Sequence, residues 1–142
     1  MQTFKYSVNG RKKLCFTKNT DLSRIPEAAR KIMSRFAAEK CGAEDEISVI
    51  ETEKPISDKL KEELRRLNKT DVINNPDGYV IKMSEGSITV SANSESGIMN
   101  GLMTFLRLLD DEGCYGKEML CDYPISSIRG IKLMIPARED IQ

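Results

Sequence analysis

Two glycines four residues apart, Gly97 and Gly101, most constrain the fold, because they stand inside the strongest helical pattern of the chain. Around them, apolar residues recur at the spacing of one helix face: Ile98, Met99, Leu102, Phe105, Leu106 and Leu109. Glycine inside a helix costs about 1 kcal/mol relative to alanine. Two glycines in one register therefore predict that this helix closely approaches a neighbouring sheet. Simple tolerance of both glycines is the alternative.

The segments that precede this helix are typical of strands. Between residues 79 and 92, apolar residues alternate on both sides of Glu85-Gly86, which predicts a β-hairpin. At the start of the chain, residues 4–8 also alternate, and Asn9-Gly10 is typical of a tight turn. We therefore predict a second hairpin, with residues 13–17 as the returning strand.

The remaining pattern completes an α+β chain. Further elements are predicted as follows: a helix over 25–36, a strand over 47–50, a short surface helix over 57–68 capped by Ser57, and a strand over 118–121. Helices that follow hairpins pack on the sheet that the hairpins build. The sequence predicts a two-layer α+β sandwich, in which a mostly antiparallel or mixed sheet carries the helices on one face.

Charge and hydropathy exclude several classes of partner. The chain of 142 residues has 22 Lys and Arg against 22 Asp and Glu, so no net field attracts nucleic acid or an anionic membrane. No apolar run approaches the roughly 18 residues that a membrane span needs. The start, MQTFKYSVNG, has no hydrophobic signal core, which favours a cytoplasmic location.

Side chains suited to catalysis are scarce. The chain contains no histidine, so it lacks a Ser–His or Cys–His nucleophile pair. It also lacks the GxxxxGK[ST] phosphate loop and a GxGxxG motif after a strand. The densest acidic cluster, Asp110-Asp111-Glu112, is interpreted as a solvated helix exit. We expect neither catalysis by these residues alone nor a cofactor.

Four cysteines stand at positions 15, 41, 114 and 121, without a CxxC pair. Zinc sites usually pair their ligands at a spacing of two to four residues, so we expect no metal. Cys15 and Cys41 are interpreted as small core residues. Cys114 and Cys121 can approach each other across a short loop, but reduced thiols are the favoured interpretation. A small redox or metal protein built on these cysteines is one alternative function.

Three collinear segments resemble one known family. Residues 78–92, GYVIKMSEGSITVSA, resemble the GYxLxIxxxxIxIxA hairpin of the non-catalytic domain that precedes the barrel in glycoside hydrolase family 20, the β-N-acetylhexosaminidases. Residues 97–109, GIMNGLMTFLRLL, resemble the next helix of that domain, GxxxGLxTLxQLL, with Arg107 in place of the usual glutamine. Residues 122–130, DYPISSIRG, resemble the family's DxPxxxxRG passage into its barrel. Before residue 75, only the order of strands and helices matches.

This resemblance implies a domain boundary near residue 124. Residues 1–124 are then an N-terminal accessory domain, and residues 125–142 are the truncated start of a catalytic (β/α)₈ barrel, a unit of about 250 residues. In the family, the arginine of the Arg-Gly pair contacts sugar hydroxyls, which makes Arg129 a candidate substrate-binding residue. Its planar fork suits vicinal oxygens. An ion pair with a carboxylate at the domain boundary is the alternative.

The chain also departs from the family pattern. That pattern continues RGxxxDxxR, whereas here Met134 occupies the aspartate position and Arg138 comes one residue late. The sugar specificity, and the contact of Arg129 with substrate, therefore stay open. The family's catalytic Asp-Glu pair lies farther along the barrel. Its retaining mechanism uses the acetamido carbonyl of the substrate as nucleophile, while a glutamic acid protonates the leaving oxygen.

The sequence thus predicts an accessory domain of a β-N-acetylhexosaminidase-like glycosidase. Its expected partners are the catalytic barrel of its own parent chain, which it packs against and supports, and the carbohydrate substrate of the intact enzyme. Related α-glucuronidases and O-GlcNAc-type hydrolases carry a similar front domain. An independent carbohydrate- or protein-binding module is the alternative. Aromatic rings that could stack on sugars are scarce, however, because the sequence contains no Trp and only 4 Phe and 4 Tyr.

Overall fold

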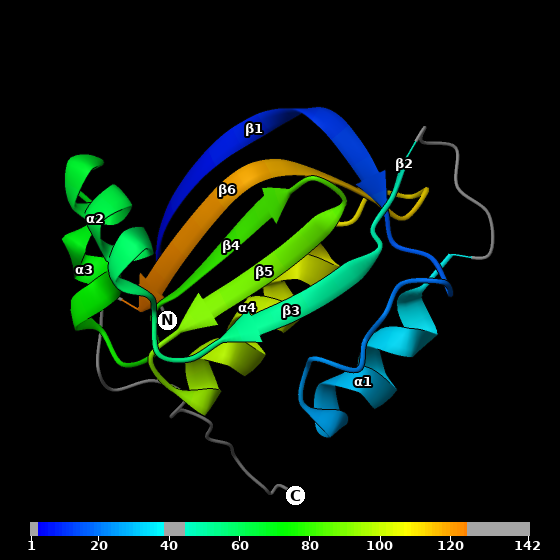
Figure 1. The fold of residues 1–142 in the computed structure, drawn as a ribbon, viewed down its shortest axis with the longest axis horizontal. Coiled ribbons are helices and arrows are strands. Elements are labelled where there is room, and N and C mark those ends of the chain that lie inside the picture. Colours follow the sequence, from blue (N-terminus) through cyan, green and yellow to red (C-terminus); the bar gives the residue numbers. More distant parts are fainter. Residues whose placement is uncertain (1–2, 39–44, 125–142) are drawn as a thin grey trace, which may run out of the picture.

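A curled mixed sheet organises the computed structural model, which describes residues 3–38 and 45–124 (Figure 1). The strand order is β2-β1-β6-β4-β5-β3. Pairing is parallel between β1 and β2 and between β3 and β5, and antiparallel at the other ladders. The strands are β1 (Thr3–Cys15), β2 (Asp45–Glu46), β3 (Val49–Glu53), β4 (Tyr79–Ser84), β5 (Ser87–Ala92) and β6 (Cys114–Pro124).

One predicted hairpin is confirmed and the other is wrong. β4 and β5 pair from Tyr79↔Ala92 to Ser84↔Ser87, and Gly86 takes a positive φ of 81° in their turn. The N-terminal segment, in contrast, is the single long strand β1, which pairs along its length with β6. Asn9-Gly10 lies where that pairing shifts register, so the apparent turn signal marks an irregularity of the ladder instead of a chain reversal.

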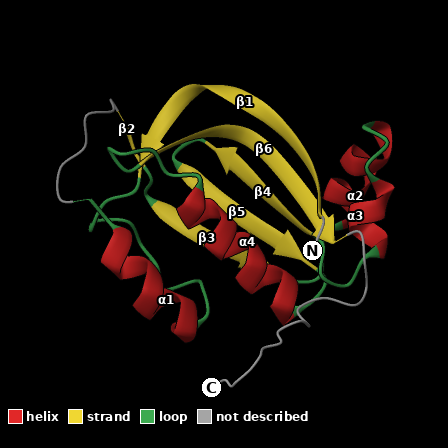
Figure 2. Cartoon of the chain, turned by 180° about the vertical axis from the view of Figure 1, so that it is seen from behind, coloured by secondary structure: helices red, strands yellow, loops and turns green. Residues whose placement is uncertain are grey.

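The helices lie on both faces of the sheet, so the expected two-layer sandwich with helices on one face is not confirmed. α1 (Glu27–Met33), which continues into the 3₁₀ turn η1 (Ser34–Phe36), and α4 (Glu95–Arg107) lie on one face of the sheet (Figure 2). Buried residues of α1 and α4 share a core with the inward side chains of β4 and β5, whereas no residue of η1 is buried. α2 (Asp58–Arg66) and α3 (Thr70–Asn74) instead form a second core on Val80, Met119 and Cys121. Neighbouring residues of one strand point to opposite faces, which separates the two cores.

Serine caps mark the starts of two of these helices. The predicted Ser57 cap is present, because its hydroxyl accepts the Leu60 N–H at 3.3 Å at the start of α2. Ser94 caps α4 in the same way, through the N–H of Gly97 at 3.0 Å. The short helix α3 was not predicted. In the described parts of the chain, no helix combines the length and apolar character needed to cross a bilayer.

The glycines of α4 allow the close approach that their spacing predicts. A Cβ atom at Gly97 would lie 2.8 Å from both the Ala92 Cβ and the Gly78 carbonyl oxygen. A Cβ atom at Gly101 would lie 2.4 Å from Val90 Cγ1 and 3.2 Å from the Tyr79 ring. Simple tolerance is thereby excluded at both positions. The backbone of α4 therefore rests directly on β4 and β5.

Replacing Gly101 by alanine is expected to destabilise the domain by about 2 kcal/mol. The new methyl group overlaps the stiff, fully buried Val90 side chain, and such overpacking costs about 1–3 kcal/mol, more than the roughly 1 kcal/mol that helix propensity returns. Urea unfolding followed by circular dichroism measures the change. Ser96→Ala, on the exposed side of the same helix, is the matched control and should be neutral or slightly stabilising. Equal stability of Gly101→Ala and wild type would contradict the close packing.

Candidate functional site

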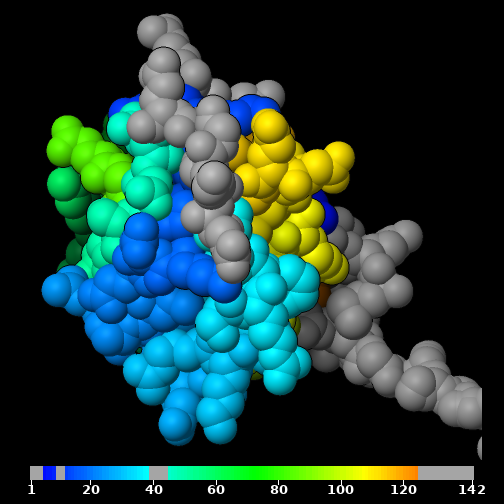
Figure 3. All heavy atoms as spheres, turned by 90° about the vertical axis from the view of Figure 1, so that its right-hand side faces the viewer, coloured from blue at the N-terminus to red at the C-terminus, as the bar shows by residue number. Residues whose placement is uncertain are grey.

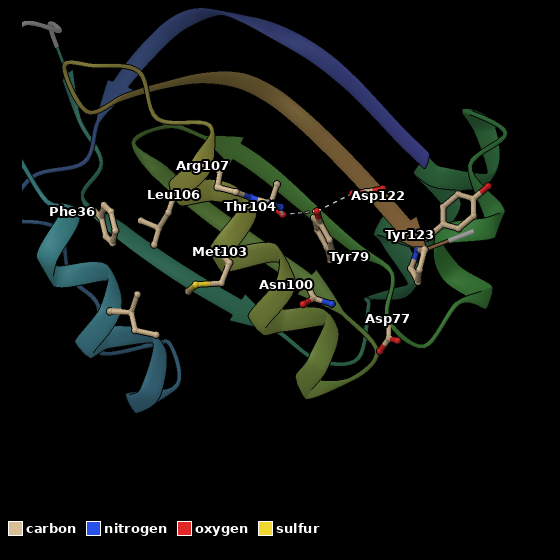
Figure 4. A pocket seen from close by; sticks show the side chains of 12 residues that line it. Phe36, Asp77, Tyr79, Asn100, Met103, Thr104, Leu106, Arg107, Asp122 and Tyr123 are labelled. Carbon is tan, nitrogen blue, oxygen red and sulfur yellow. Dashed lines mark hydrogen bonds between the residues drawn. The ribbon is translucent and has the colours of Figure 1, made fainter. Parts of the chain in front are cut away.

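A chain of polar contacts joins the three segments that carry the family resemblance. The Tyr79 hydroxyl lies 2.7 Å from Thr104 Oγ1 and donates to Asp122 Oδ2 at 3.1 Å (Figure 4). Thr104 Oγ1 accepts from Arg107 Nη2 at 3.0 Å. With Tyr79 donating to Asp122, the Thr104 hydroxyl donates to Tyr79. The contacts therefore run in one direction, from the Arg107 guanidinium to the Asp122 carboxylate.

Gly101 makes this arrangement possible. The Tyr79 ring packs against Gly101, and Thr104 follows one turn later on the same helix face, within reach of the Tyr79 hydroxyl. Tyr79, Thr104 and Asp122 are all buried, whereas Arg107 lies at the surface end. Burial is the main cause that raises the pKa of Tyr79 to about 12. The hydroxyl therefore remains a donor over the physiological pH range.

The network forms one wall of a groove of about 650 Å³ between α1, α4 and the end of β6. Its apolar lining includes two of the most exposed large apolar side chains of the described residues, Phe36 at 55% and Ile32 at 38%. Both belong to the apolar pattern of the helix predicted over 25–36. The core buries Ile25, Ala29 and Met33 of that pattern but leaves Ile32 and Phe36 exposed in the groove. The full lining is Ile32, Phe36, Asp77, Tyr79, Asn100, Met103, Thr104, Leu106, Arg107, Asp122, Tyr123 and Pro124.

A second hollow continues this groove past Phe36 and Leu106, which line both. It lies where η1 meets the turn after α4. Figure 3 shows the end of the molecule that carries these two segments, in cyan and yellow. Asp110 closes that turn: its Oδ1 accepts the N–H groups of Glu112 and Cys114, each at 2.9 Å, and its Oδ2 pairs with Lys13 at 3.1 Å. These hydrogen bonds lower the pKa of Asp110. Asp110 thus has a structural role in the turn that was interpreted as a solvated exit.

The predicted substrate-binding residue, Arg129, lies outside the described residues, as do Met134 and Arg138. No metal is expected from the sequence, and among the described residues no cluster of three Cys, Asp or Glu side chains could hold one. The polar network itself was not predicted. Its signal in the sequence is that Tyr79 and Thr104 place hydroxyls at positions where the strand and helix patterns demand buried residues.

The cysteines behave only partly as predicted. Cys114 and Cys121 are buried free thiols, and burial raises the pKa of Cys121 to about 11. The reduced state expected for Cys114 and Cys121 is thus confirmed. Cys15 is fully buried, as predicted, but it is disulfide-bonded, which corrects its interpretation as a plain core residue. Neither Cys114 nor Cys121 is its partner. Cys41 lies outside the described residues.

Comparison with known proteins assigns the fold to a family. The family model described as glycosyl hydrolase family 20, domain 2, matches residues 7–125. The chain therefore belongs to that family, and the match ends one residue after β6. No curated protein sequence matches the chain. The solved structure of CpGH84B is similar, with a TM-score of 0.50 at 14% identity over 86% of this chain. This chain spans only 21% of the length of CpGH84B.

Removing the Tyr79 hydroxyl should destabilise the domain by about 1–3 kcal/mol. In Tyr79→Phe, a buried carboxylate and a buried threonine both lose a partner, and unsatisfied buried groups carry the full cost of desolvation. Tyr123→Phe is the matched control, because it removes an exposed hydrogen bond to Asp71. Its expected cost is below about 0.5 kcal/mol. Chemical unfolding of both variants measures the difference, and equal losses would contradict a special role for the buried network.

Alkaline pH should unfold the domain partly through Tyr79. Its folded pKa of about 12 exceeds the ordinary unfolded value near 10, so its contribution is complete below pH 10 and is lost as the pH rises towards 12. Burial also raises the pKa of Tyr115, so wild type loses stability through both groups. Unfolding free energies measured from pH 8 to 12 should fall less steeply in Tyr79→Phe than in wild type. Identical slopes would contradict this assignment.

Proposed function

We propose that this chain is the accessory domain of a glycosidase, packs against the catalytic domain of the same polypeptide, and performs no catalysis itself. The observation that carries the proposal is the match of residues 7–125 to the second domain of a glycosyl hydrolase family. The small share of CpGH84B that this chain spans supports a role as one part of a larger protein. The catalytic groups of such a protein then belong to another domain.

The groove supports this role by its position. β6 ends at Pro124, which itself lines the groove, so whatever follows along the chain starts there. The exposed side chains of Phe36 and Ile32 lie in the same groove. Because these side chains are 55% and 38% exposed, covering each contributes about 1 kcal/mol, roughly half of what full burial gives. A domain attached at this point would gain that energy while already held at high effective concentration by the covalent connection.

The finer assignments follow from the family and are part of the proposal. Residues 1–124 form the accessory domain, and residues 125–142 begin a (β/α)₈ barrel in the parent protein. Arg129 then binds hydroxyls of the sugar substrate through its guanidinium fork. The parent enzyme acts as a β-N-acetylhexosaminidase, in which the substrate acetamido group is the nucleophile.

A carbohydrate-binding module is the second candidate, and the groove supplies the observation that favours it. Sugar sites combine an aromatic ring face with amide and carboxylate groups that bind hydroxyls, and here Phe36, Asn100 and Asp77 line one groove. Titration of the chain with N-acetylglucosamine oligomers separates the two candidates. Saturable binding that Phe36→Ala abolishes supports the module, whereas no binding supports a surface that another domain covers.

The reading frame beyond Gln142 and the enzyme that it encodes test the leading proposal. The frame should continue into βα repeats with an adjacent Asp-Glu pair, and the parent protein should hydrolyse an aryl N-acetyl-β-glucosaminide that this chain alone leaves intact. In the parent, Arg129→Ala should lower kcat/KM about 100-fold, because a charged hydrogen bond contributes up to about 3 kcal/mol. Arg129→Lys keeps the charge without the fork and should recover part of that loss. A frame without a following domain, or hydrolysis by this chain alone, would refute the proposal.

A further inference from the structure

Arg107 holds an unusual position in the groove. It ends α4 and lies on the groove surface, among apolar lining residues such as Met103 and Leu106 (Figure 4). Among the described residues, its guanidinium makes one hydrogen bond, to Thr104, and no ion pair. A guanidinium carries five N–H donors in a fixed fork. Most of its N–H donors therefore have no acceptor among the described residues.

Covering the groove changes what Arg107 requires. A partner that buries Phe36 and Ile32 also removes water from the guanidinium that lies between α4 and the end of β6. A buried charge without a partner costs several kcal/mol, so an apolar partner surface alone would not bind here. A carboxylate placed opposite the fork can form two parallel, charge-assisted hydrogen bonds, which compensates the lost water.

We propose that Arg107 is the polar anchor of the domain interface and pairs with a carboxylate of the domain that follows residue 125 in the same polypeptide. The inference rests on the proposed function and adds the chemistry of the partner surface, which is apolar around one acidic side chain. The occupant is that domain because the chain leaves β6 at Pro124, inside the groove. Glutamine, the residue at this position in the resembled motif, offers no charge for such a pair.

Thr104 explains why this pair would be well oriented. Its Oγ1 accepts from Arg107 Nη2 and is itself placed by the buried Tyr79 hydroxyl. One donor of the fork is therefore fixed by groups of the core, so less side-chain entropy is lost when the remaining donors bind an acceptor. Arg107 is thus held in position at the surface by the network that runs through Thr104 and Tyr79 to Asp122.

Thermal unfolding of the parent protein and of this 142-residue chain tests the proposal. In the wild-type parent, this domain should melt several degrees above the isolated chain, because docking stabilises it. Arg107→Glu should lower the melting temperature of the domain by about 4 °C or more in the parent, but by about 1 °C or less in the isolated chain. Arg107→Gln should give an intermediate loss in the parent. Replacing the facing carboxylate by arginine should restore the Arg107→Glu parent.

Arg66→Glu is the matched control. Arg66 also ends a helix, α2, and is exposed, but it lies with the second core on the other face of the sheet. Both reversals disturb a helix dipole equally, so only Arg107→Glu should distinguish the parent from the isolated chain. Equal shifts for Arg107→Glu in both settings, or none in either, would overturn the anchor and leave the proposed function standing. A wild-type domain that melts identically alone and in the parent would overturn both.

Discussion

The contact on which the structure depends is the direct packing of the α4 backbone on β4 and β5. Gly97 and Gly101 leave no room there for any side chain, since even a methyl group would overlap Ala92 or Val90. The same closeness brings Thr104 to the Tyr79 hydroxyl, and Tyr79 to the end of β6 at Asp122. The close packing of α4 on the sheet and the hydrogen bonds of Tyr79 therefore depend on the same position of α4.

The sequence predicts those elements whose pattern and local signals agree. The 79–92 hairpin, α4 and the Ser57 cap follow from alternation, helical spacing and capping chemistry. Asn9-Gly10 gave a wrong prediction, because a turn-forming dipeptide also fits an irregularity inside a long strand. Only the pairing with β6 distinguishes that irregularity from a hairpin turn. The assignment of helices to two faces was equally inaccessible, since the apolar stripe of α2 does not say which face of the sheet it covers.

The candidate site was also predicted only in part. Family motifs identified Thr104 and marked Arg107 as a departure, yet they did not show that both belong to one network with Tyr79 and Asp122. That convergence joins residues far apart in sequence and depends on tertiary structure. The helical pattern over 25–36 likewise did not show that Ile32 and Phe36 would stay exposed while Met33 is buried. An apolar helix pattern does not distinguish residues that pack in the core of the domain from residues that would contact a second domain.

The position of β6 affects how this polypeptide is made. Among the described strands, β6 is the last to leave the ribosome, but it lies between β1 and β4 and supplies nearly the whole ladder of β1. Until then β1 can pair only at Leu14 and Cys15, with β2. A nascent chain therefore carries a long strand with an open edge until β6 has been made, and such edges promote aggregation. Cells that produce this protein should depend on chaperones that shield the strand until translation has passed residue 124.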